Sequence, residues 1–248
     1  MLKWFTDAGI VAVYGWSGKL GSVINMLFVQ SFQLAFGVLG LKTLNSKADA
    51  KTLYPRVFRH YVIWTGWAVL GLSLLAYDVT RWVSPNPDYL DVDSLVFPIA
   101  LGYMAYGLYY ILINVLYSEM KTRTIAGIMM LACGINLILN YFLIPQYGAL
   151  GAAYATTISY VSLVAMTYGK ARKVIDIPYP WMVTAMVTGF IFTLFLLSHP
   201  SANWDVVSRL AYRAGLILAF PILILVFRIY TLSEVKDVVK NRGILSDD

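Results

Sequence analysis

Charged side chains, cysteine and histidine are scarce in this sequence, and their scarcity excludes several classes of protein. Only 13% of the 248 residues are charged, whereas 59% are hydrophobic. Soluble domains carry about a quarter charged residues, so the composition excludes a soluble globular fold with a single membrane anchor. The one cysteine, Cys133, lies within an apolar run, which excludes an intrachain disulfide.

Motifs for covalent catalysis and for phosphate-binding loops are also absent. The sequence holds no G-x-S-x-G or H-E-x-x-H pattern, and its apolar runs hold no paired carboxylates. The segment GWSGKL at residues 15–20 approaches a phosphate-binding loop, but Val13 replaces the first glycine and Leu20 replaces the Ser/Thr. We therefore expect a protein that is not an enzyme, without catalytic residues, metal site or cofactor. The net charge of +6 does not indicate nucleic acid binding, because the basic residues lie between apolar runs.

Long apolar runs dominate the chain. A membrane-spanning helix needs about 20 mostly apolar residues. Seven runs qualify or come near: Ile10–Gly37, Tyr61–Tyr77, Leu95–Tyr117, Ile125–Ile144, Leu150–Tyr168, Trp181–Leu197 and Leu210–Tyr230. We predict an all-α, polytopic transmembrane helix bundle over residues 1–230, followed by a polar cytoplasmic tail at residues 231–248.

Lysine and arginine alternate between the loops, which predicts the orientation. Basic residues follow the first, third, fifth and seventh runs, and the other loops hold few. Basic loops stay in the cytoplasm, so the N-terminus is predicted outside, the C-terminus inside, and His60 and His199 on opposite sides. Arg213 is interpreted as snorkelling to the outer surface. The outer loop carries four aspartates, Asp78, Asp88, Asp91 and Asp93, and the last three are interpreted as solvated, not as a cation site.

The stretch from Asn136 to Ser162 is typical of two helices joined by a tight turn. Pro145 is predicted to end the first helix, because proline cannot continue it. Small residues then recur on one face of the second helix, where we expect close helix packing: Gly148, Ala152, Ala155, Ser159 and Ser162. Asn136 and Asn140 lie four residues apart and are predicted to hydrogen-bond between helices, with a ligand contact as the alternative.

The same stretch resembles a known family. The asparagine pair, Leu143-Ile144-Pro145, Tyr147-Gly148 and Gly151-Ala152-Ala153 occur in the order seen in the C-terminal half of bacterial polysaccharide (O-antigen type) flippases. These belong to the multidrug/oligosaccharidyl-lipid/polysaccharide exporter superfamily. Tyr14 with Gly18-Lys19, and Glu119–Thr122, are similar to two further family segments.

The resemblance implies a multi-pass inner-membrane flippase. Its cargo would be an undecaprenyl-diphosphate-linked oligosaccharide for lipopolysaccharide, O-antigen, capsule or exopolysaccharide assembly, and its partners would be this lipid-linked oligosaccharide and membrane lipids. Matching the motifs makes the seven helices the eighth to fourteenth of a longer protein. We therefore expect a missing N-terminal half or a second copy, with a genuine seven-helix protein as the alternative.

Two helices carry polar faces at membrane depth. Lys19 lies about 14 Å inside the first run, near the middle of a ~30 Å hydrocarbon core, where a charge is costly unless it faces a cavity or partner. Gln30 and Gln33 are predicted on the same face. Tyr106, Tyr110 and Asn114 form a stripe on the third run. We expect Lys19 to bind the diphosphate and the other five residues to bind sugar; snorkelling of Lys19 and tyrosine packing are the alternatives.

Three other readings compete with the flippase. A multidrug exporter of the same superfamily favours intramembrane carboxylates, and the predicted helices contain none. A polytopic enzyme of envelope glycan synthesis predicts a cluster of His, Asp or Arg on one side. A seven-helix receptor shares the topology but usually has an extracellular disulfide.

Overall fold

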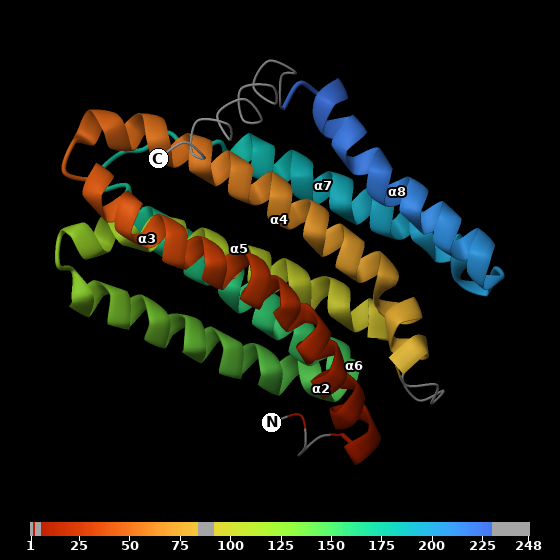
Figure 1. Cartoon of the computed structure of the whole chain (residues 1–248). Coiled ribbons are helices and arrows are strands. Elements are labelled where there is room, and N and C mark those ends of the chain that lie inside the picture. Colours follow the sequence, from red (N-terminus) through yellow and green to blue (C-terminus); the bar gives the residue numbers. More distant parts are fainter. Residues whose placement is uncertain (1, 3–5, 84–91, 230–248) are drawn as a thin grey trace.

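The computed structural model describes residue 2, residues 6–83 and residues 92–229, and these form a bundle of long helices (Figure 1). The first helical rod consists of α2 (Ala8–Ile24), the π-helix η1 (Asn25–Gln30) and α3 (Ser31–Thr43). The remaining elements are α4 (Lys47–Val83), α5 (Val92–Ser118), α6 (Thr122–Ala171), α7 (Trp181–Ser198), η3 (His199–Asn203) and α8 (Val206–Val226). Within the described residues, six helical segments are long and apolar enough to cross a membrane. The prediction of an all-α polytopic bundle is confirmed.

Helix α5 forms the centre of the bundle. Of its most apolar 18-residue window, 72% is buried, against 22% for the first rod. It packs against α2, α3, α4 and α6. Gly107 allows α4 to cross it closely, because a side chain there would occupy the position of the Tyr61 ring, whose hydroxyl donates to the Met104 carbonyl. The central position of α5 places its polar residues inside the protein.

Helix α6 is a hairpin whose two arms are joined at Gly148. Gly148 has φ 55° and ψ −128°, a conformation that side chains disfavour. Its second arm runs alongside α5, since Thr157 donates to the Pro98 carbonyl (2.6 Å) and Tyr160 stacks on Tyr106. The predicted small-residue face is largely buried: Ala152, Ala155 and Ser159 are buried and Ser162 is half-buried. Closest approach occurs at Gly151, where a Cβ would collide with the Leu143 carbonyl.

The predicted end of the hairpin's first arm is wrong by three residues. Pro145 lies inside the helix, which continues to the break at Gly148. Proline removes one backbone donor and clashes with the preceding turn, and this arm tolerates that cost because it ends almost at once. The positive φ of glycine, and not the proline, reverses the chain.

Helices α7 and α8 pack on α4. Gly66 of α4 faces Val187 and Ile191 of α7 and Phe220 of α8. The indole of Trp67 donates to the Ile217 carbonyl of α8 at 2.9 Å. In Figure 1 these two helices lie on the side of α4 away from the α6 hairpin. The chain therefore forms a layered bundle in which α4 and α5 lie between most of the hairpin and α7 and α8, and the hairpin meets α7 near Tyr168, whose ring is 5.0 Å from that of Trp181.

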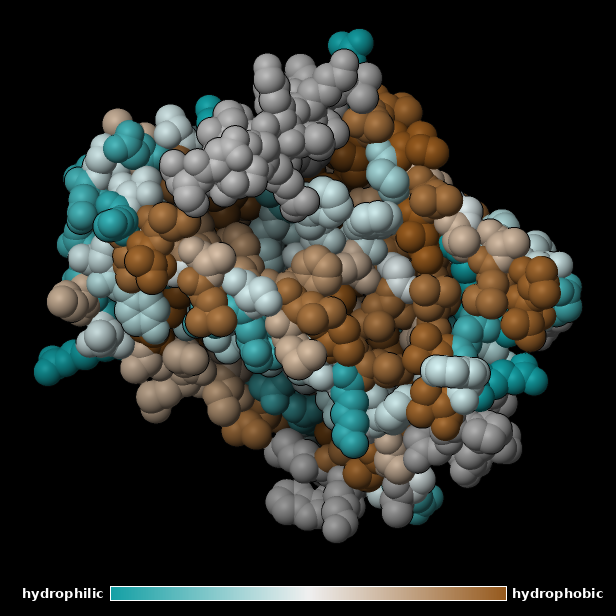
Figure 2. Space-filling view, in the orientation of Figure 1, coloured by the Kyte–Doolittle hydropathy of each residue, from teal (hydrophilic) through white to brown (hydrophobic). Residues whose placement is uncertain are grey.

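The helix connections fall at two ends of the bundle, as Figure 1 shows. The α3–α4, α5–α6 and α6–α7 connections share one end, which we call the basic end, with Lys42, Lys121 and Lys170 near them. Apolar residues cover much of the middle of the molecule, and hydrophilic residues gather toward the two ends (Figure 2). This matches a multi-pass membrane protein, whereas the cytoplasmic position of the basic end remains a prediction.

Several predicted helix limits are wrong. Helix α4 begins at Lys47 and not at Tyr61, so Lys51, Arg56 and Arg59 lie in a helix and not in a loop. An apolar run marks only the part of a helix that lies within the hydrocarbon. The helix itself can extend beyond that run, because a helical backbone is also stable in water. Asp88, Asp91 and residues 231–248, predicted as outer loop and tail, lie outside the described residues.

Candidate functional site

A cavity of about 510 Å³ lies between the first rod and α5, toward the basic end. Its walls are η1 and α3 on one side and the second half of α5 on the other. The lining residues are Gln30, Phe32, Gln33, Leu34, Phe36, Gly37, Val38, Leu41, Tyr110, Ile113, Asn114 and Tyr117. We call it the α3–α5 cavity. None of these lining residues is charged.

The structure brings together five of the six residues predicted from sequence. Gln30, Gln33, Tyr110 and Asn114 line the α3–α5 cavity. Tyr106 lies one turn away, and its hydroxyl is 2.7 Å from that of Tyr110. Gln30 and Gln33 are exposed and Asn114 is buried, so the cavity offers amide groups at its mouth and at its base.

Gly40 determines how closely α3 approaches Asn114. A Cβ at Gly40 would lie 2.9 Å from the Asn114 amide nitrogen and 3.0 Å from the Tyr54 hydroxyl. Both distances are shorter than ordinary van der Waals contact, so any larger residue here would displace these side chains. The helix backbone thus closes one side of the cavity against the asparagine.

A set of stacked tyrosines supports the cavity from the α6 side. The rings of Tyr106 and Tyr160 stack with centroids 4.8 Å apart and planes 28° apart, and the Tyr103 and Tyr160 centroids are 6.2 Å apart. Tyr106 also meets Tyr110 edge to face at 4.9 Å. Such aromatic contacts restrain ring orientation, so the Tyr110 hydroxyl has a fixed position at the cavity wall.

Lys19, the sixth predicted residue, does not line this cavity. It is exposed on α2 and has no side-chain hydrogen bond or ion pair within the described residues. The π-helix η1 explains the separation. A π turn takes about one residue more than an α turn, which rotates everything after it by about 100° relative to a continuous α-helix. Lys19 and Gln33, placed on one face by α-helical spacing, are therefore separated.

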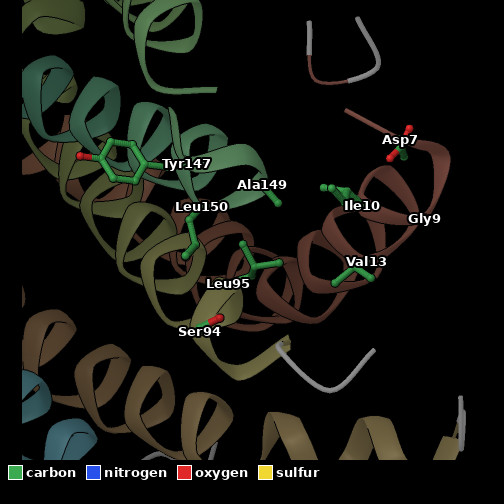
Figure 3. Close-up of a pocket in the computed structure, with 9 residues that line it drawn as sticks. All are labelled: Asp7, Gly9, Ile10, Val13, Ser94, Leu95, Tyr147, Ala149 and Leu150. Atoms are coloured by element: carbon green, nitrogen blue, oxygen red, sulfur yellow. The ribbon is translucent and has the colours of Figure 1, made fainter. Parts of the chain in front are cut away.

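A second cavity, of about 640 Å³, opens at the end opposite the basic end (Figure 3). It lies where the start of α2 and the start of α5 meet the tip of the α6 hairpin. Figure 3 shows Asp7 on one side and Tyr147 on the other, with the Tyr147 hydroxyl directed away from Asp7. None of the six predicted residues lines it.

A buried ionic cluster at this opposite end was missed by the sequence analysis. Asp78 of α4 accepts from Arg209 at 2.6 and 2.9 Å and from Arg213 at 3.0 Å. Arg209 and Arg213 also donate to the carbonyls of Trp204 and Leu74. Both arginines lie near the Tyr77 ring, at 5.0 and 5.9 Å from its centroid.

This cluster corrects two predictions. Arg213 does not snorkel, because it is buried and paired with Asp78. The predicted end of the second helix at Tyr77 is also wrong, because α4 continues through Asp78 to Val83. The charge of Asp78 is matched by two guanidinium groups that tie α8 to α4, so the arrangement explains its burial.

Asn136 and Asn140 do not join two helices. The Asn140 amide donates to the backbone carbonyl and to the side-chain oxygen of Asn136, both at 2.9 Å. The i, i+4 spacing places both groups on one face of the same arm. They satisfy each other there, which corrects the predicted contact between helices.

The chain is similar to known proteins both in family and in structure. The family model described as "Lipid II flippase MurJ" matches residues 83–226. Among solved structures, "Lipid II flippase MurJ, inward closed conformation" superposes with a TM-score of 0.67 at 16% identity, covering 89% of this chain and 48% of that chain. No curated protein matches.

These matches support the helix arrangement and the coarser form of the predicted resemblance. The structural likeness concerns the fold, since the identity is low, and the chain spans about half the length of that flippase. The family model covers more than half of the chain and describes transporters of a lipid-linked precursor, not catalysts. It does not support an assignment to O-antigen flippases. The chain belongs to the lipid II flippase MurJ family.

Proposed function

We propose that this chain forms the C-terminal part of a flippase that moves a polyprenyl-diphosphate-linked saccharide across the inner membrane. The observation that carries the proposal is the α3–α5 cavity, which presents amides and tyrosines without any charged residue. Ligand pockets combine apolar and aromatic walls with a few placed polar groups. This lining suits an uncharged saccharide better than a diphosphate.

Lys19 is the proposed contact for the diphosphate. It precedes Gln30 by eleven residues, or about 16 Å along a helix, so the two subsites are separate. Lysine binds phosphate as a point charge, and its exposure on a spanning helix is costly without a partner. The rest of the transporter would cover this face, supplied by an N-terminal half or by a second copy of the chain.

The family match favours the peptidoglycan precursor lipid II as cargo over an O-antigen oligosaccharide. Both share the polyprenyl diphosphate and differ in the saccharide. Two complementation assays distinguish these cargoes. A lipid II flippase should restore growth to a strain depleted of its own lipid II flippase, whereas an O-antigen flippase should restore O-antigen to a strain that lacks its O-antigen flippase. The multidrug-exporter alternative predicts neither result.

Substitutions test the subsites in a full-length flippase context. Gln33→Leu should reduce complementation at normal protein level, whereas the matched change Gln146→Leu at the exposed hairpin tip should not. Lys19→Ala should abolish complementation and Lys19→Arg should retain part of it, because the charge is kept while its geometry changes. Full activity of both Lys19→Ala and Gln33→Leu would refute the proposed sites.

A further inference from the structure

A separate groove of about 540 Å³ lies between the first rod and α4, also toward the basic end. We call it the α3–α4 groove. Its lining comes from two helices: Leu27, Phe28, Ser31, Phe32, Arg56, Val57, His60, Tyr61, Trp64 and Thr65. The π-helix η1 supplies Leu27 and Phe28, and π segments are frequent at functional sites.

The chemistry of the groove changes along its length. Arg56 and His60 lie at the end nearest the start of α4, and aromatic and aliphatic side chains form most of the rest. Nine residues of α4 separate Arg56 from Thr65, a rise of about 14 Å. One leaflet of a bilayer has a hydrocarbon depth of about 15 Å, half of the ~30 Å core. The apolar part of the groove on α4, from Tyr61 to Thr65, spans about 6 Å, so the groove extends from the headgroup region into the adjoining hydrocarbon of one leaflet.

Arg56 lies at the depth of a lipid headgroup. It precedes Tyr61, where the apolar run of α4 begins, by five residues or about 7.5 Å. Its side chain is exposed and makes no hydrogen bond or ion pair within the described residues. The Nδ1 of His60 donates to the Arg56 carbonyl at 2.7 Å, which orients the ring beside it. Arginine matches phosphate geometry with two parallel donors.

We propose that the α3–α4 groove binds an anionic phospholipid. Its phosphate contacts Arg56, and one acyl chain lies along Phe28, Phe32 and Trp64. Charge complementarity selects this occupant, since Arg56 places a positive charge at the headgroup end of the groove and basic pockets between spanning helices bind anionic headgroups. The groove has no side-chain amide, and the Tyr61 hydroxyl is already bonded to Met104, so it offers little to a saccharide. The proposal does not depend on the proposed cargo.

Phospholipid retention by the purified chain, measured by native mass spectrometry, tests the proposal. The probes are phosphatidylglycerol and phosphatidylcholine with identical acyl chains. The parent should bind phosphatidylglycerol more tightly. Arg56→Gln should weaken that binding by roughly tenfold, as expected for the loss of one charge-assisted contact. Lys51→Gln removes the same charge from the same helix outside the groove and should have no effect.

A second variant and two competitors separate the possible occupants. Trp64→Ala should weaken both phospholipids, because it removes apolar surface from the groove, and Trp64 is exposed enough to be replaced without unfolding. Equal losses in Arg56→Gln and Lys51→Gln, or no loss in either, would overturn the proposal. Displacement of the bound phosphatidylglycerol by glycerol phosphate, which lacks an acyl chain, would also overturn it. Displacement by undecaprenyl phosphate at a lower concentration than phosphatidylglycerol itself would overturn it too, because the groove would then belong to the cargo.

Discussion

Replacing Asp78 by asparagine should destabilise the chain strongly. The substitution leaves the guanidinium groups of Arg209 and Arg213, which are 2% and 3% exposed, without their shared carboxylate. Breaking a buried ion pair by removing one partner costs about 3–5 kcal/mol. The bonds to the Trp204 and Leu74 carbonyls survive the change, which favours the lower part of this range.

The effect is large enough to measure by thermal unfolding. For chains of this size, 1 kcal/mol shifts the midpoint by about 2–4 °C, so Asp78→Asn should lower it by about 6–20 °C. Scans of parent and variant at one rate in the same detergent keep the comparison valid if unfolding is irreversible.

An exposed aspartate provides the matched control. Asp176 lies 3.8 Å from Arg172, and both side chains are more than half exposed. Such surface pairs contribute about 0–1 kcal/mol, so Asp176→Asn should shift the midpoint by less than about 4 °C. Equal shifts for the two variants would refute the reasoning that burial makes the Asp78 cluster stabilising.

The same cluster should hold the α7–α8 connection closed. Ser198 is buried near the cluster. The natural cysteine, Cys133, is exposed and would react with the reagent itself, so it is replaced first. In a Cys133→Ser background, a cysteine at Ser198 should react slowly with a thiol reagent in the parent and faster with Asp78→Asn. An unchanged rate would show that the cluster stabilises the bundle without restraining this connection.

Three further predictions concern orientation, packing and a helix cap. A cysteine at Ser46 should react with an impermeant reagent only after permeabilisation; labelling in intact cells would reverse the topology. Ala155→Leu should lower the free energy of unfolding by about 1–3 kcal/mol through overpacking, whereas Ala165→Leu on the exposed face should be tolerated. If both variants were tolerated equally, both faces would lie in lipid. The Ser208 backbone N–H donates to Asp205 and lowers its pKa, so this stabilisation should be present above the ordinary aspartate pKa and lost as the pH falls through the lowered value; an acid transition unchanged in Asp205→Asn would contradict it.

The sequence predicts features that the membrane imposes on any chain. Apolar run length locates the spanning helices, because hydrocarbon thickness fixes the number of residues required. Helical periodicity also places Tyr106, Tyr110 and Asn114 on one side of α5, since that helix is regular over this region. Gln33 and Asn114 line one cavity because α3 packs against α5, and no pattern in the sequence indicates that packing. Both residues are assigned to the sugar site from the chemistry of their side chains alone.

Two features could not be predicted for identifiable physical reasons. Asp78 and Arg209 are 131 positions apart, and run length places both in loops, so nothing local indicates their pairing. The π-helix at Asn25–Gln30 has no sequence marker, and it changes which face of the first rod each later residue occupies. The Asp78 pairing is why Arg213 does not snorkel, and the π-helix is why Lys19 and Gln33 do not share a face.

The polar residues of the spanning helices differ in whether the fold itself satisfies them. Arg209 and Arg213 are buried and fully engaged with Asp78, so their role is explained within this chain. Lys19, Gln30 and Gln33 are exposed on the first rod and make no side-chain hydrogen bond within the described residues. Hydrocarbon cannot satisfy such groups. Their energetic cost is therefore best met by cargo or by a covering protein surface, so substitutions at these three residues should alter transport more than stability.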